Sequence, residues 1–243
     1  MPRTISNNQA IQRLTAVSLF LPTVTTPFDQ TTAGATADRS DTIVVPATTN
    51  ASDTDKLFII GSNGTEINAI DGTVNVTMPL LNKTAFAHPA GTRVLEATEH
   101  ALGRIEVGGF TISPSQQETL IEAADLITAM QTIKGTLELS FSFGLLNHNA
   151  QNFLNALGYA DNETGAGTAA DKWISTVGDP TSTVLSIIAF KASFLLFTGY
   201  TMDVYLTNCS IAPQGAIAMG AKNAASVIPY SGKASYICRH EYI

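Results

Sequence analysis

Residues 136–143 alternate strictly between apolar and polar side chains, and this alternation constrains the fold more than any other feature of the sequence. The apolar positions are Leu137, Leu139, Phe141 and Phe143. The polar positions are Thr136, Glu138, Ser140 and Ser142. Because successive side chains on a β-strand point to opposite faces, the pattern predicts a strand with one dry face and one wet face.

Short apolar runs separated by turn residues predict further strands along most of the chain. These runs are 43–45, 57–60, 74–78, 105–112, 184–197, Thr201–Thr207 and 233–238. The dipeptides Asn63–Gly64 and Asp71–Gly72 are the strongest local signals for hairpin turns. The sequence therefore predicts a mainly β protein.

One short helix is predicted directly after the alternating strand, over 147–158. Its apolar residues follow the spacing i, i+3, i+4, i+7 at Ala150, Phe153, Leu154 and Leu157. An asparagine at 147 or 149 supplies an N-cap, and Gly158 supplies a stop. We expect this helix to pack on a sheet. The acidic segment 116–130 also has helical spacing, but a loop leading into a strand fits it equally well, so both alternatives stay open.

Changes in composition divide the chain into three parts. Residues 1–41 are expected to form an N-terminal arm and linker, since 25–41 is polar with Pro, Gly and small residues. Residues 42–98 are expected to form a small β-module, and residues 99–243 a larger β domain with a flexible connection at 161–170. The apolar run 14–24 is too short to cross a membrane, so no membrane insertion is expected.

Charge is sparse and unevenly placed. Charged residues make up 14% of the chain, which is low for a soluble protein, and the formal net charge is −7. Residues 1–95 carry six Lys/Arg against seven Asp/Glu, whereas residues 96–243 carry seven against thirteen. A protein that grips nucleic acid by neutralising phosphates shows the opposite sign. We therefore expect this chain to repel DNA rather than hold it.

Catalytic, cofactor and metal motifs are missing from the sequence, so no enzyme activity, cofactor or metal is expected. The Gly-rich run at 165–172 lacks the GK[ST] ending of a phosphate-binding loop. Asp53 and Asp55 are not followed by a calcium loop. The histidines are scattered without ligand spacing, at His88, His100, His148 and His240. Cys209 and Cys238 fit reduced thiols of a protein made in a cytoplasm.

Three segments of the C-terminal region carry a resemblance to a known family. They are LGRIEVGGFTISP at 102–114, KGTLELSFSFGLLNHNAQNFLNALG at 134–158 and TMDVYLTNCSIAPQGAIAMG at 201–220, with KASY at 233–236 fitting a closing strand. In this order they resemble the tail tube proteins of long-tailed bacteriophages. The resemblance implies a β-barrel or β-sandwich with one short packed helix.

A second resemblance covers 58–94, which is similar to a small β-module found in many phage structural proteins. The residues that fit its pattern are Gly61, Glu66, Pro79, Leu80, His88, Gly91, Thr92 and Val94. In that context His88 is expected to be a turn or packing residue.

The tail tube resemblance implies a structural protein of the virion, made in the host bacterial cytoplasm. Such subunits form hexameric rings that stack into a hollow tube, contact the tape measure, terminator and tip or baseplate proteins, and let double-stranded DNA pass. We then expect Thr136, Glu138, Ser140 and Ser142 to face the lumen or a wet interface. Leu137, Leu139 and Phe141 would lie on the core side.

Two other classes of function compete with this interpretation. One is an adaptor or baseplate ring protein of the same fold, or a capsid decoration protein, which would not polymerise into tubes. The other is a carbohydrate-binding or hydrolytic β-protein of the tail tip. That role needs clustered aromatic residues or paired carboxylates, and the chain has a single tryptophan, Trp173.

Overall fold

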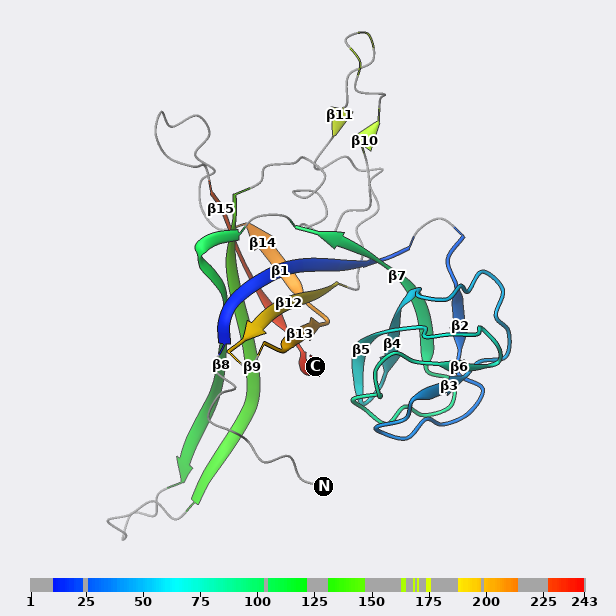
Figure 1. The fold of residues 1–243 in the computed structure, drawn as a ribbon. Coiled ribbons are helices and arrows are strands. Elements are labelled where there is room, and N and C mark those ends of the chain that lie inside the picture. The colour runs from blue at the N-terminus through cyan, green and yellow to red at the C-terminus, as the bar shows by residue number, and fades with distance from the viewer. Residues whose placement is uncertain are drawn as a thin grey trace.

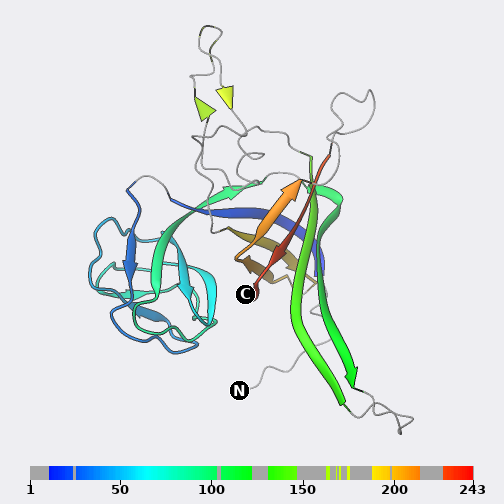
Figure 2. The same ribbon diagram turned by 180° about the vertical axis from the view of Figure 1, so that it is seen from behind.

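The protein is mainly β in the computed structural model, as the sequence predicts (Figures 1 and 2). The structure describes residues 11–23, 26–102, 105–121, 131–146, 188–197, 199–213 and 227–242, with short pieces at 163–164, 168, 170 and 174–175. No helix occurs in these ranges. The short helix expected over 147–158 lies outside the described residues.

A large sheet of eight strands forms the centre of the molecule. Its order is β16-β13-β12-β1-β7-β4-β5, with β2 paired to β7. The bounds are β1 Ile11–Pro22, β2 Asp29–Thr31, β4 Lys56–Gly61, β5 Gly64–Ala69, β7 Arg93–Ala101, β12 Ala189–Leu196, β13 Thr201–Thr207 and β16 Tyr236–Tyr242. The strand β1 lies inside this sheet, between β12 and β7, although it falls in the segment expected to be an arm.

The large sheet curls until its two ends meet. The hydroxyl of Thr207 on β13 donates to the backbone carbonyl of Thr65 on β5 over 2.6 Å, and this hydrogen bond is buried. The rings of Phe86 and Tyr236 meet edge to face at the same end, with centroids 5.5 Å apart. Barrel-like curling of this kind leaves fewer strand edges open to other chains.

A second sheet of four strands packs on the large one, in the order β14-β15-β9-β8. The bounds are β8 Ile105–Ile121, β9 Gln131–Leu145, β14 Ser210–Pro213 and β15 Ile228–Ala234. Side chains of both sheets share one core, in which Phe141 and Phe143 contact Phe190 of the large sheet. Beyond this core, β8 and β9 continue together as a long hairpin that leaves the body of the molecule (Figure 1).

A small lobe, residues 28–97, stands beside this sandwich (Figure 1). It holds β2, β4, β5 and a two-stranded sheet of β3 Thr42–Val44 and β6 Thr77–Pro79. Its main apolar cluster runs from Phe28 to Val94. Phe28 has no exposed surface, although it lies in the segment expected to be a linker. The strand β7 belongs to both lobes, since it pairs with β4 up to Ala97 and with β1 from Ala97 onward.

Three local predictions differ from the structure. The expected strand over 233–238 is broken at Ser235, where the chain leaves β15 for β16 in the other sheet. The apolar residue Leu137 was expected on the core side but is 52% exposed, because the large sheet does not extend far enough to cover it. In the segment left open between helix and strand, residues 116–121 lie in β8.

Candidate functional site

The outer face of the four-stranded sheet is built almost entirely from small hydroxyl side chains. Cross-strand register brings them together, because directly opposed residues in an antiparallel pair project from the same face. Ser142 lies between Thr111 of β8 and Ser231 of β15, and Ser140 lies between Ser113 and Lys233. Ser115 is opposite Glu138, and Ser210 of β14 is opposite Lys233. We call this set the hydroxyl face: Thr111, Ser113, Ser115, Glu138, Ser140, Ser142, Ser210, Ser231 and Lys233.

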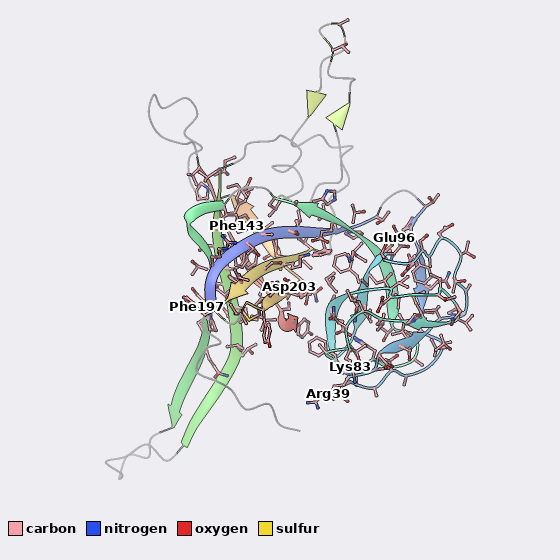
Figure 3. The ribbon with its side chains drawn as sticks, in the orientation of Figure 1. Arg39, Lys83, Glu96, Phe143, Phe197 and Asp203 are labelled. Carbon is pink, nitrogen blue, oxygen red and sulfur yellow. The ribbon has the colours of Figure 1, made fainter. Side chains whose placement is uncertain are left out.

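The opposite side of the same sheet is apolar and holds the hydroxyl face in place. Phe143 lies between the two sheets (Figure 3) and stacks on Phe110 and Tyr230 at ring-centroid distances of 5.6 and 5.4 Å. Gly232 leaves room for the ring of its neighbour Phe141, since a Cβ there would lie 2.6 Å from that ring. The period-two pattern therefore separates a packed face from a hydrated one.

Only one ion pair occurs among the described side chains of the hydroxyl face. Lys233 Nζ donates to Glu138 Oε2 over 3.1 Å, and both side chains are largely exposed, at 66% and 58%. They sit diagonally across neighbouring strands, since Lys233 is directly opposite Ser140. The described part of the face thus carries no net charge.

A shallow hollow of about 510 Å³ opens over the hydroxyl face beside Lys233. It is lined by the serines of all four strands, and Gly232 lies at its floor. A second hollow of about 490 Å³ lies on the other side of Glu138, lined by Ser115, Gln116 and Thr136.

Three of the four predicted site residues belong to the hydroxyl face, and the fourth, Thr136, lines the second hollow beside Glu138. Thr136, Glu138 and Ser142 are exposed, and Ser140 is half-buried. Their neighbours from β14 and β15 were not singled out from sequence, because they lie more than sixty residues further along the chain. The alternation of Phe110 and Ile112 with Thr111 and Ser113 was the local signal that could have placed β8 beside them.

Both outer strands of the four-stranded sheet have one edge without a partner strand among the described residues. Each edge carries a proline, Pro114 in β8 and Pro213 in β14. Proline has no N–H to give to a ladder, so it is accommodated in edge strands where that N–H would point away from the sheet. Because N–H directions repeat every second residue, the N–H of Ile112 points to the free edge of β8.

The small lobe contains a buried hydrogen-bonded pair, His88 and Glu66, and a third residue of the module pattern, Gly61, packs against it. His88 Nε2 lies 2.7 Å from Glu66 Oε1, and both side chains are almost fully buried. The other carboxylate oxygen accepts the backbone N–H of Ala85 over 2.5 Å. Gly61 makes room for the imidazole, because a Cβ there would lie 2.4 Å from His88 Nδ1. His88 is thus buried in the packing of the small lobe, with its Nδ1 next to Gly61.

A partly buried ion pair lies where the two lobes meet. Lys191 on β12 donates to the carboxylate of Glu99 on β7 and lies over the ring of Phe20, 5.6 Å from its centroid. Burial acts to raise the pKa of Glu99, but the hydrogen bond and charge of Lys191 outweigh it and hold that pKa below its ordinary value. Nearby on β7, Glu96 (Figure 3) accepts the backbone N–H of Phe28 over 3.0 Å. The contact of Glu96 with Phe28 lies within the small lobe, whereas Lys191, Glu99 and Phe20 belong to the large sheet beside it.

Within the part of the chain that the structure describes, no three His, Cys, Asp or Glu side chains gather as a metal site would require. In the same ranges there is no helix of the length and hydropathy needed to cross a membrane. Burial raises the pKa of the Cys209 thiol, and its Sγ donates to the carbonyl of Leu206, which keeps the thiol protonated.

No protein-family model matches this chain, and no curated protein is significantly similar to it.

Proposed function

We propose that this chain is the repeating subunit of a bacteriophage tail tube, with the hydroxyl face lining a channel through which double-stranded DNA passes. The observation that carries the proposal is the four-stranded sheet itself. One of its faces is packed, the other is hydrated and uncharged overall, and both of its edges are open within the described residues. Closing such a sheet with copies of itself into a barrel would require its edges to pair on either side of Pro114 and Pro213, which have no N–H to give to a ladder.

Ring closure would pair the free edge of β8 in one subunit with the free edge of β14 in the next. Six copies would give about 24 strands, and at a spacing of ~4.8 Å and the usual strand tilt the barrel radius would be roughly 24 Å. Side chains as small as serine and threonine take little of that space. A duplex would fit inside, and the long β8–β9 hairpin would extend along the tube to the next ring.

The chemistry of the hydroxyl face supports passage of DNA rather than binding. Serine and threonine hydroxyls keep the wall hydrated, and the single described lysine is paired with a carboxylate. A wall without net positive charge offers phosphates no counterion release, which is the main source of affinity for DNA. In this role the protein acts by assembly, in the virion, with other tail proteins as partners and without catalysis.

Electron microscopy of the purified full-length protein tests this proposal. We expect open-ended tubes built from stacked rings, with the small lobe on the outside. Isolated rings would support an adaptor or baseplate role instead, and stable monomers at high concentration would contradict any ring.

Matched variants at Ile112 test the pairing of edges. Ile112→Pro removes the N–H that points to the free edge of β8, whereas Ile112→Ala keeps that N–H and also shortens the side chain. We expect Ile112→Ala to form tubes and Ile112→Pro to remain unassembled while both keep the β-type circular dichroism of the parent. Tubes of normal length from Ile112→Pro would rule out pairing through this part of β8.

A further inference from the structure

The hydroxyl face contains the parts of a phosphate-binding site. Lys233 supplies a positive charge that is 66% exposed, and the serines beside it line a hollow that also includes Phe141 and Ile211. An ammonium group next to several hydroxyl donors is a common arrangement for holding a phosphate oxygen. Without a neighbouring negative charge, this surface would attract the phosphates of DNA.

The carboxylate of Glu138 takes one of the three N–H donors of Lys233, in the way that a phosphate oxygen would. Its Oε2 accepts the hydrogen bond from Lys233 Nζ at 3.1 Å. Because Glu138 is on β9 and Lys233 on β15, the contact depends on the register of the two strands rather than on neighbours in sequence. The carboxylate also repels any second anion that approaches the lysine.

We propose that Glu138 masks Lys233, so that a phosphate site on the hydroxyl face stays closed to the DNA backbone. This inference rests on the tail tube function proposed above, because DNA would pass the hydroxyl face only inside such a tube. The ligand class is a nucleic acid phosphate, and the specificity-determining residue is Glu138, which excludes that ligand.

The magnitude of the effect grows with assembly. One exposed ion pair contributes little by itself. In a ring of six, however, loss of the mask would present one lysine from every subunit to the same duplex. Each lysine that engages a phosphate steepens the dependence of log K on log salt by about 0.9, so a fully engaged ring would steepen it by about 5.

Charge-matched variants separate masking from a general change of net charge. Glu138→Gln removes the mask, and the double variant Glu138→Gln with Lys233→Gln removes the site as well. Asp38→Asn changes the net charge as Glu138→Gln does, but at an exposed carboxylate in the small lobe. The probes are immobilised heparin for the unassembled chain and a short fluorescent DNA duplex for assembled tubes.

On heparin, Glu138→Gln should elute at higher salt than the parent protein, and the double variant should elute with the parent or earlier. Asp38→Asn should shift less than Glu138→Gln. In sedimentation of tubes with the duplex, only Glu138→Gln should retain DNA at low salt, at least tenfold above the parent, and should release it as salt rises. Retention that persists in the double variant, or equal shifts for Glu138→Gln and Asp38→Asn, would overturn the masking.

The two proposals fail in different ways. If no tubes form but Glu138→Gln still shifts on heparin through Lys233, the tail tube function fails and the masked phosphate site stands. If tubes form and Glu138→Gln neither shifts on heparin nor retains the duplex, the mask fails and the channel stands.

Discussion

Gly61 offers a sharp test of how the small lobe is held together, because it lies against the buried imidazole of His88. In a Gly61→Ala variant the new Cβ would lie 2.4 Å from His88 Nδ1 and 3.3 Å from the carbonyl oxygen of Gly64. The imidazole has little freedom to yield. The backbone of His88 exchanges two hydrogen bonds with Thr36, at 2.7 and 2.8 Å, and its ring Nε2 is hydrogen-bonded to Glu66.

Two effects set the expected loss of stability. Overpacking of a filled site costs about 1–3 kcal/mol, and loss of the hydrogen bond to a buried carboxylate costs about 1.5–3 kcal/mol. We therefore expect Gly61→Ala to lower the free energy of unfolding by about 3–5 kcal/mol. Gly34→Ala in the same lobe is the control. No atom lies within 4 Å of a Cβ at Gly34, so its effect should stay below about 0.5 kcal/mol.

A double-mutant cycle with His88→Ala, followed by urea unfolding and far-UV circular dichroism, tests the physical reason. His88→Ala alone should lower the free energy of unfolding by about 3–5 kcal/mol, since it leaves Glu66 buried without its partner. In that background the added methyl at Gly61 meets no ring and should cost little, so the coupling energy should be nearly as large as the loss of about 3–5 kcal/mol expected for Gly61→Ala alone. Additive losses would refute the claim that Gly61 exists to accommodate His88.

Three further predictions concern buried polar groups. The buried side-chain amide of Asn68 donates to the backbone carbonyl of Asn82 at 2.8 Å and accepts its backbone N–H at 3.0 Å. Asn68→Ala leaves both backbone groups without this partner, so it should lower the free energy of unfolding, measured in urea, by about 2 kcal/mol. The ionised form of Glu99 stabilises the fold above the ordinary glutamate pKa, and this contribution is lost as the pH falls through its lowered value. Lys191→Met removes the main interaction that lowers this pKa and leaves the burial that raises it. The free energy of unfolding should therefore fall at neutral pH, and the variant should lose less stability than the parent as the pH drops through the glutamate range, as measured by urea unfolding at several pH values. The protonated thiol of Cys209 should react with iodoacetamide at least tenfold more slowly in the folded protein than in urea, as followed by mass spectrometry of its peptide; equal rates would contradict its burial.

The sequence predicts strand faces well because they depend on a local period of two. The burial of Leu139, Phe141 and Phe143 follows directly from the alternation. Leu137 has the same local pattern and is nevertheless exposed. Its environment depends on where the large sheet ends, which no local pattern records. The break at Ser235 was missed for a similar reason, since the chain changes sheets there without a proline or glycine.

The candidate site was predictable only in part. Ser140 and Ser142 could be assigned to a wet face from β9 alone. Lys233 could not be joined to Glu138, because that contact spans 95 positions of sequence and depends on the register of β15 against β9. Register between distant strands is fixed by the packing of both sheets, so a single sequence carries little trace of it.

The continuity of β7 has a mechanical consequence. A linker between two lobes would let each one swing, but here one strand is hydrogen-bonded into both, with Ala97 opposite Lys56 on one side and Pro22 on the other. A force applied to the small lobe is therefore transmitted along β7 and loads the hydrogen bonds between β7 and β1, at the centre of the large sheet, in shear. Ladders loaded in this way yield only when many bonds break together, so the small lobe should hold a fixed angle under load.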